Sequence, residues 1–536
     1  MVQTRNYHIP CGSAGHTLKF MARTLKLYFT LLSAFVLCFG ASNGGAEDRK
    51  RASSSDAANE VVLHGTVTGR QNNTYIEAPF EVPAGTQRVT LTFSYTGKEE
   101  RTTLDIGLLD PKGLRCWSGG NKSTLTVSAT DATPSCLAGP VGAGTWKLLI
   151  GVPNIRPNVT AAYTANVFFT ESGLVRDQPM VLRSSLRSGP AWFRGDLHMH
   201  TAHSDGSCNS LRGVKVPCPV FVIAEAAARK GLDFIAVTDH NTTSQNDAMR
   251  ELQPYFDSLL MIPGREMTTF HGHANLFGTV APLDFRVGSR DVPDINTLFR
   301  QANLIGGLIS INHPNAPTGE ACMGCGWNPT PEADLNLVQA IEVVNGGAED
   351  GPFAGLSFWE KQLNRGFRLT GIGGSDNHTA QRPLDEVGSI GSPTTVVYAT
   401  ELSTSAILAA IRAGHVFVDL TASKDRLLEL RVQSGDSMAS MGDTLAAVAG
   451  SEVEFSVHVA GVEGGKLLLV EDGQPMAESS TQAIHGQDQT IQSHWKSDGK
   501  QHWFRSDVHG PDGKLWLMGN PIYINWSPSG GKRVMQ

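Results

Sequence analysis

The stretch GDLHMHTAHSDG, residues 195–206, contains three histidines and two aspartates among twelve residues. His198 and His200 are two positions apart, so on a short strand both rings point to the same side and can bind one cation. Asp205 follows on a turn made by Gly206. A polar loop that happens to be rich in histidine is the alternative, and the rest of the sequence must decide between the two.

More histidines and carboxylates follow other short apolar runs. One histidine after a strand is most often a satisfied structural residue, but six separate segments of this kind favour a metal centre. The residues that follow these runs are Asp239 and His240 in TDH, Glu266 in PGRE, His271 and His273 in HGHANLFG, His313 in INHP, and Asp376 and His378 in GGSDNH.

The elements that must position these residues alternate between helix and buried strand. Residues 220–232 have helical spacing and precede the apolar run DFIAVTDH, and residues 295–307 precede LISINHP. Repetition of this unit predicts an α/β fold with a parallel sheet or barrel. The polar residues then lie at the carboxyl ends of the strands, where α/β barrels gather their ligands.

Two flanking regions alternate with period two instead, which is typical of antiparallel strands. VTLTFSY and WKLLI belong to the first region and EVEFSVHV to the second. We therefore predict a β-sandwich over residues 55–175, the metal-binding α/β domain over 190–420, and a C-terminal β-rich, Ig-like domain over 425–530.

The N-terminus has the pattern of an export signal. Lys26 and two earlier basic residues precede the apolar run of residues 27–39, which is shorter than the roughly 20 residues of a membrane span. We predict a signal peptide over residues 1–46, cleaved near Ala46, with an uncleaved anchor as the alternative. Met21 is a possible start. This pattern predicts a periplasmic or extracellular protein.

Cysteine usage agrees with export. Six of the eight cysteines lie beyond the predicted signal, and an even set in an exported protein predicts disulfides. Their connectivity stays open, although pairing by neighbours is the simplest. CMGC could also be half of a zinc site, but no second thiol pair follows it at suitable spacing. The neighbour pairs are Cys116 with Cys136, Cys208 with Cys218, and Cys322 with Cys325.

Composition excludes several classes of function. A chain of 536 residues predicts two or three domains. A net charge of -7 gives no basic face for nucleic acid, and nothing beyond the signal segment predicts a membrane partner. We find neither the G-x-S-x-G of serine hydrolases nor a phosphate loop with its lysine. Oligomeric state stays open.

The motifs DLHMHTAHSDG, FIAVTDHN, PGREMTTFHGHANLFG, INHPNAP and GGSDNH resemble those of the polymerase and histidinol phosphatase (PHP) superfamily of metallohydrolases. GHANLFG and the terminal GNPIYI resemble its exported CehA/McbA-type branch. The resemblance implies a distorted (β/α)7 barrel holding two or three divalent transition-metal ions. The ligands it implies are His198, His200, Asp205, His240, Glu266, His273, His313, Asp376 and His378.

Within that set the resemblance makes Glu266 the bridging carboxylate. Of the two candidates in AHSDG, Asp205 is preferred and His203 is a lesser candidate. Of the two histidines in HGHANLFG, His273 fits the family pattern better than His271.

Other polar residues receive secondary roles. Asp196 and Asp239 are predicted to orient neighbouring histidines without binding metal. His415, which opens a late strand, is interpreted as structural. Arg265 and Arg382 are candidate contacts for an anionic substrate.

The chemistry of such a centre is hydrolysis. A cation lowers the pKa of bound water toward about 7, so a metal-bound hydroxide can attack an ester. Histidines with carboxylates suit Zn, Mn or Fe. Asp376, His378 and Glu266 are the predicted catalytic residues, with Asp376 or a histidine moving the proton. The resemblance favours a phosphoesterase acting on a small-molecule ester. A carboxylic ester or carbamate hydrolase is the alternative, followed by a non-catalytic binding protein.

Overall fold

The computed structural model describes residues 60–118, 122–133, 135–171, 185–318, 322, 324–347, 350–476 and 481–526. The predicted signal peptide and its alternative start lie outside these residues. Residues 56–536 form one compact unit. None of the described helices is long and apolar enough to cross a bilayer.

The first region is a sandwich of two antiparallel four-stranded sheets, ordered β1-β8-β3-β6 and β2-β7-β4-β5. Alternate residues point inward as the period-two pattern predicts, and Leu91, Ile106 and Trp146 are fully buried between the sheets. The elements are β1 (Glu60–Thr68), η1 (Gly69–Gln71), β2 (Thr74–Val82), β3 (Thr86–Tyr95), β4 (Thr103–Asp110), β5 (Gly113–Trp117), β6 (Thr124–Ser128), β7 (Gly144–Asn154) and β8 (Thr160–Glu171).

The second region holds the predicted metal residues and mixes helices with strands. Helix α2 ends where the sequence predicts, at Gly231, whose φ of 77° belongs to the left-handed region that caps helices. The elements are β9 (Arg187–Asp196), β10 (Ser207–Asn209), β11 (Lys215–Pro217), α2 (Val220–Lys230), β12 (Phe234–Val237), α3 (Gln245–Leu252), β13 (Leu260–Thr269), β14 (Gly272–Phe277), α4 (Ile295–Leu304), β15 (Leu308–Ile311), η3 (Leu335–Leu337), β16 (Ala340–Asn345), α5 (Leu356–Asn364), β17 (Thr370–Gly374), β18 (Thr394–Leu402), α6 (Thr404–Ala413) and β19 (Val416–Asp419).

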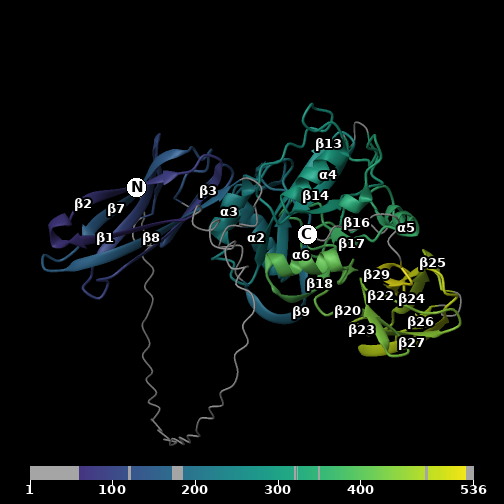
Figure 1. The fold of residues 1–536 in the computed structure, drawn as a ribbon. Coiled ribbons are helices and arrows are strands. Elements are labelled where there is room, and N and C mark those ends of the chain that lie inside the picture. Colours follow the sequence, from purple (N-terminus) through teal and green to yellow (C-terminus); the bar gives the residue numbers. More distant parts are fainter. Residues whose placement is uncertain are drawn as a thin grey trace, which may run out of the picture. The chain divides into compact units, whose positions relative to one another are not determined.

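The strands of this region run in the order β17-β16-β15-β14-β13-β12-β9-β18-β19. Helices α4 and α5 lie near β14 and β16 in the ribbon (Figure 1). Phe299 of α4 and Trp359 of α5 lie in one core with Ile309 of β15 and Val343 of β16. Burial of these large side chains stabilises the frame on which the polar strand ends are carried.

The sheet differs from the expected parallel barrel. Strand β12 pairs in parallel with β9 and β13, but β14 is antiparallel to both of its neighbours. Only Phe270 and His271 connect β13 to β14, which leaves no room for the crossover helix of a parallel pair. In the described part of the chain β17 pairs with β16 alone, so a closed (β/α)7 ring is not shown.

The third region also departs from a separate sandwich. One layer is the sheet β21-β20-β23-β27, but the facing strands continue the central sheet through the antiparallel pairing of β19 with β29. Leu430, Val457, Leu469 and Phe504 share the core between the layers. The elements are β20 (Leu427–Ser434), β21 (Ser437–Ser440), β22 (Thr444–Leu445), β23 (Glu452–Ala460), β24 (Lys466–Glu471), β25 (Gln474–Pro475), β26 (Gln482–Ala483), β27 (Asp488–Lys496), β28 (His502–His509), β29 (Leu515–Gly519) and β30 (Ile522–Ile524).

The structure has the three disulfides that neighbour pairing predicts. They join Cys116 to Cys136, Cys208 to Cys218, and Cys322 to Cys325. CMGC is therefore a disulfide in this structure.

Candidate metal centre

The structure brings all nine residues of the predicted ligand set into one cluster. They come from the ends of β9, β12, β15 and β17, from within β13 and β14, and from the loop before β10. Three groups within the cluster have ligand atoms close enough together to hold an ion. These groups are His200, Asp205, His240 and His378; His198, Glu266 and His313; and His198, His200 and Asp376.

Glu266 lies at the middle of the cluster and is 1% exposed. Its Oε1 is 3.2 Å from His273 Nδ1 and 3.5 Å from both His198 Nε2 and His313 Nε2. Its Oε2 is 2.8 Å from His240 Nδ1. The two oxygens of this carboxylate therefore face different histidines.

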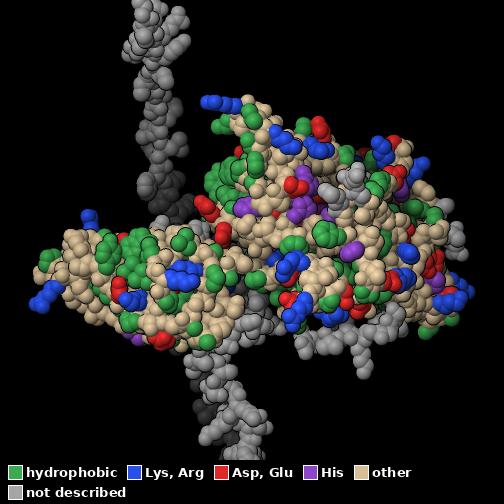
Figure 2. Space-filling view, turned by 90° about the horizontal axis from the view of Figure 1, so that it is seen from above, with side chains coloured by type: hydrophobic (Ala, Val, Ile, Leu, Met, Phe, Trp, Pro, Cys, Tyr) green, Lys and Arg blue, Asp and Glu red, His purple; other side chains and the backbone are tan. Residues whose placement is uncertain are grey.

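Asp376 and Asp205 complete the other two groups. Asp376 Oδ1 is 3.2 Å from His200 Nε2 and 3.3 Å from His198 Nε2. Asp205 Oδ1 is 3.4 Å from His378 Nε2 and 3.6 Å from His240 Nε2. The Asp205 and His378 side chains are 58% and 39% exposed, so this group faces solvent while the Glu266 group is buried. Histidine side chains gather on one face of the molecule (Figure 2).

Some buried ring nitrogens of the centre have no hydrogen-bond partner in the protein and could bind a cation instead. His273 Nε2 and His313 Nδ1 are buried and have no hydrogen-bond partner. Each such atom costs about 1–3 kcal/mol when nothing satisfies it. Imidazole nitrogens and carboxylates are common ligands of divalent metal ions, so the donor set suits such ions.

Two residues of the cluster follow the ends of strands and have unusual backbone conformations. His313 has a φ of 27° and Asp376 a φ of 50°, both in the left-handed region. Non-glycine residues there cost on the order of 1–3 kcal/mol, and such conformations concentrate at functional sites. The turns direct these side chains into the cluster as their strands end.

The charges of the cluster support one another. Burial raises the pKa of Glu266, but the charge of His198 and the bonds from His198, His240 and His273 outweigh it and hold the pKa well below its usual range. Burial lowers the pKa of His378, but the hydrogen bond to Asp205 and the charge of Asp376 raise it to about 9. Without ions, therefore, His378 is protonated at neutral pH, and a cation must displace that proton.

Glu342 is a functional residue that the sequence analysis missed. Its Oε1 accepts a hydrogen bond from His198 Nδ1 at 2.9 Å, and its Oε2 accepts one from the His313 backbone at 3.0 Å. Since a carboxylate can only accept, Nδ1 of His198 carries a hydrogen, and Nε2 is the ring nitrogen that faces the centre. A single acid in the buried strand AIEVVN is the signal that could have identified it.

Asp196 and Asp239 hold backbone rather than imidazole rings. Asp196 accepts bonds from the backbone N–H groups of His198, Ser375 and Gly391. Asp239 accepts from both the backbone N–H and the hydroxyl of Thr201 at 2.7 Å. The two aspartates therefore fix the segments that carry the predicted ligands, and they do so through the backbone and through Thr201.

Four other candidates lie apart from the cluster. His203 is exposed, and its Nδ1 bonds Ser244 Oγ at 2.7 Å. His271 is an exposed residue of the β13–β14 turn, and His415 faces Asp443 at 3.8 Å. Arg265 is buried and donates to the carbonyl of Ala281, so its predicted contact with an anion does not fit.

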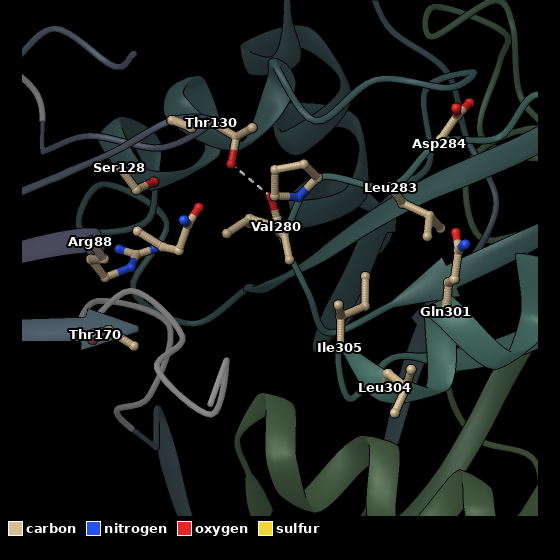
Figure 3. A pocket seen from close by; sticks show the side chains of 14 residues that line it. Arg88, Ser128, Thr130, Thr170, Val280, Leu283, Asp284, Gln301, Leu304 and Ile305 are labelled. Carbon is tan, nitrogen blue, oxygen red and sulfur yellow. Dashed lines mark hydrogen bonds between the residues drawn. The ribbon is translucent and has the colours of Figure 1, made fainter. Parts of the chain in front are cut away.

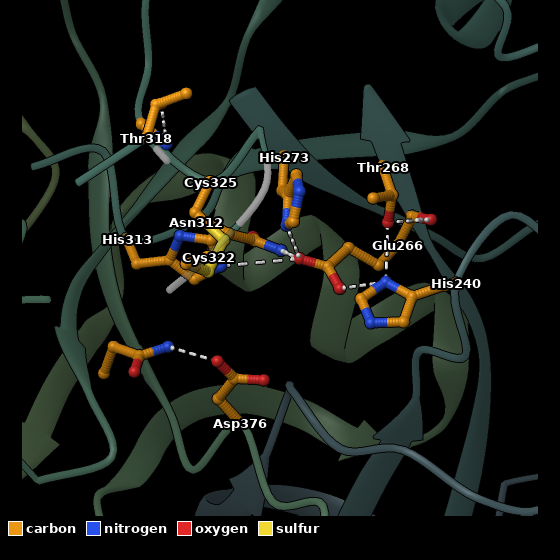
Figure 4. Close-up of a disulfide and its surroundings, with 12 residues drawn as sticks. His240, Glu266, Thr268, His273, Asn312, His313, Thr318, Cys322, Cys325 and Asp376 are labelled. Atoms are coloured by element: carbon orange, nitrogen blue, oxygen red, sulfur yellow. Dashed lines mark hydrogen bonds and ion pairs between the residues drawn. A yellow bond between two sulfur atoms is a disulfide. The ribbon is translucent and has the colours of Figure 1, made fainter. Parts of the chain in front are cut away.

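The Cys322–Cys325 disulfide lies beside the buried half of the cluster (Figure 4). Its loop packs against the turn between β13 and β14, where a Cβ on Gly324 would come within 2.4 Å of the Thr269 carbonyl. The close approach of Gly324 and the disulfide together fix this loop next to His273 and His313.

Two cavities differ in their relation to the centre. A pocket of about 320 Å³ is lined by Asp376 and His378 and opens directly onto it. A larger cavity of about 540 Å³ is lined by Arg88, Val280 and Leu304 among others, and none of the nine predicted ligands contributes to it (Figure 3). The smaller pocket is therefore the one through which a substrate would reach the metal-binding residues.

Comparison with known proteins adds distant similarities. No protein-family model matches the chain. An uncharacterized protein of Methanocaldococcus jannaschii is 28% identical over 162 residues, which cover 30% of this chain and 85% of that protein.

Two solved structures are also similar to parts of the chain. One is a two-domain protein containing a predicted PHP-like metal-dependent phosphoesterase from Bacteroides vulgatus, with a TM-score of 0.36 and 21% identity over 65% of this chain and 99% of that one. PsfC from Pseudomonas syringae has a TM-score of 0.25 and 17% identity over 38% and 82%. Neither score carries an argument about fold or activity.

Proposed function

We propose that this chain is a metal-dependent phosphoesterase of the PHP type. The observation that carries the proposal is the cluster around Glu266, in which histidines and carboxylates converge while two buried ring nitrogens, of His273 and His313, have no hydrogen-bond partner. Two or three divalent transition-metal ions, Zn, Mn or Fe, would fit between them. When bound, such ions lower the pKa of water and neutralise charge on ester oxygens.

The chain's own residues supply position and proton transfer. Glu266 holds the buried histidines in one arrangement, and Glu342 fixes the ring of His198. Asp376 lines the small pocket, and its Oδ2 accepts a bond from Asn345 Nδ2 at 3.2 Å. That oxygen is placed to accept a proton from water and pass it to a leaving group. His378, which lines the same pocket, is the second candidate for proton transfer.

We also propose that the protein works outside the cytoplasm. Three disulfides support this, because such bonds persist in oxidising compartments. The predicted signal peptide is the sequence feature behind the proposal.

The test combines metal content with rates on three substrates. Wild type, His198→Ala and His415→Ala are analysed for bound metal and assayed with phenyl phosphate, methyl phenyl phosphate and phenyl acetate. We expect transition metal and phosphoester turnover in wild type, loss of both in His198→Ala, and wild-type behaviour in His415→Ala, since His415 lies outside the cluster.

Two results would contradict the proposal. Turnover of phenyl acetate alone would make the chain a carboxylic ester hydrolase of the CehA type. A folded wild type without metal or turnover would make it a binding protein.

A further inference from the structure

The pocket that opens onto the metal-binding residues has an uneven distribution of charge. Its lining includes the aspartate and histidine of the centre, polar groups of two loops, and the ring of Phe353. Arg382 is the only lysine or arginine among the lining residues. It is exposed, and it lies in the loop that follows Asp376 and His378.

The guanidinium of Arg382 is held in place without being neutralised. Its Nη1 donates to the carbonyl of Val387 at 2.9 Å, and its backbone N–H donates to Thr379. Asp385 and Glu386 belong to the same loop, yet neither is within ion-pair distance of Arg382. Nor is any other carboxylate in the described part of the chain, as the ion pairs found there show. Its remaining donors are free to bind an anion.

The loop that carries Arg382 is fixed by a bond within itself and by its packing against the loop after β16. Asn377 donates to the carbonyl of Gly388 at 2.8 Å. A Cβ on Gly347 would lie 2.7 Å from the side chain of Val387, which shows how closely the loops after β16 and β17 approach. The position of the Arg382 guanidinium relative to Asp376 is therefore fixed by the contacts of these loops.

We propose that Arg382 binds the phosphoryl group of the substrate and selects phosphomonoesters over phosphodiesters. The inference rests on the proposed function and names its substrate class. A monoester carries a charge close to -2 near neutral pH and a diester -1, so a guanidinium beside the centre attracts the monoester more strongly. A monoester also has three non-bridging oxygens, so the arginine fork can bind two of them and leave one for the ions of the centre, whereas a diester has only two to share.

Binding and turnover are measured separately on the metal-loaded protein. Arg382→Ala and Arg382→Lys are compared with Arg286→Ala, an exposed arginine that pairs with Asp284 and does not line the pocket. Affinity for inorganic phosphate is measured by calorimetry, and KM and kcat are measured for phenyl phosphate, methyl phenyl phosphate and phenyl acetate.

For Arg382→Ala we expect the phosphate Kd and the KM for phenyl phosphate to rise about tenfold to hundredfold, as for loss of a charge-assisted bond. KM for the diester should rise less than about threefold, and phenyl acetate and metal content should not change. Arg382→Lys should recover part of the loss, because charge remains and the fork is lost.

Equal effects on monoester and diester, or an unchanged phosphate Kd, would overturn the inference. If wild type lacks phosphoester turnover, the proposed function fails, and the phosphate Kd alone decides whether Arg382 is an anion site. If wild type turns over phenyl phosphate and Arg382→Ala does so with the same KM, only the inference fails.

Discussion

Two clusters of histidine and carboxylate in this molecule have similar composition and different geometry. In the C-terminal region, Glu471, Asp472 and His502 also lie close enough together to hold an ion. There, His502 Nδ1 is 2.6 Å from Asp472 Oδ2, and Nε2 is 3.2 Å from Asp498 Oδ1. Both ring nitrogens have partners already, whereas the centre around Glu266 leaves buried nitrogens without any.

The difference shows that residue types alone do not define a metal site. The C-terminal cluster is also more exposed, and Asp472 uses its second oxygen to accept the Trp503 backbone N–H at 2.9 Å. These bonds join the end of β24 to the start of β28 and explain the cluster without an ion. Unsatisfied buried ligand atoms are the feature that separates the two sites.

The largest effect that would sharpen this comparison is expected from Glu266→Gln. The change removes the negative charge that faces five histidines and replaces one acceptor oxygen by a donor. We expect loss of most of the bound metal, measured by elemental analysis of the purified protein. Asp472→Asn is the matched change in the other cluster and should leave metal content as it is; a loss there would end the distinction.

An intermediate effect is expected from Glu342→Gln. The variant keeps an acceptor near His198 Nδ1 but loses the charge that makes this ring a strong ligand. Changes to groups that orient ligands weaken metal binding by about tenfold to hundredfold, and we expect a change of that size in the metal Kd, measured by competition with a chelator. Glu471→Gln serves as the control, and equal affinities in the two variants would remove Glu342 from the centre.

The smallest effect is expected from Asp472→Ala. This change removes bonds to His502 and to the Trp503 backbone at a partly exposed site, so we expect the free energy of unfolding to fall by about 1 kcal/mol. Denaturant unfolding measures the change. Addition of the metal found in the wild-type centre should stabilise this variant and the wild type equally, because the Glu266 cluster remains intact.

The sequence identified the residues of the candidate centre more completely than the pairing of the strands that carry them. His198 and His200 stand two apart after an apolar run, and the segments of Glu266, His313 and Asp376 follow similar runs, so local patterns were enough to find them. Glu342 was not predicted, because nothing in the local sequence distinguishes a carboxylate that orients a histidine from an isolated acid in a strand. Its role depends on His198, which arrives from a distant strand.

The arrangement of strands shows the same limit. Alternation identified β23 as a strand, but the pairing of β19 with β29 depends on which sheet edge is free after folding. The antiparallel hairpin β13–β14 was hidden within a repeated helix and strand pattern, although the short turn through Phe270 and His271 allows nothing else. Local patterns identify helices and strands, but tertiary contacts determine which strands pair with each other.

Two isolated backbone bridges, Met199 with Asn377 and Ser207 with Thr379, join the first ligand segment to the last. Between them the chain must complete every strand from β12 to β17. Contacts of such long range form late, because loop closure opposes them until the intervening structure is in place. The nine residues of the candidate centre are therefore brought together only near the end of folding, and a nascent chain that has not yet reached His378 contains an incomplete cluster.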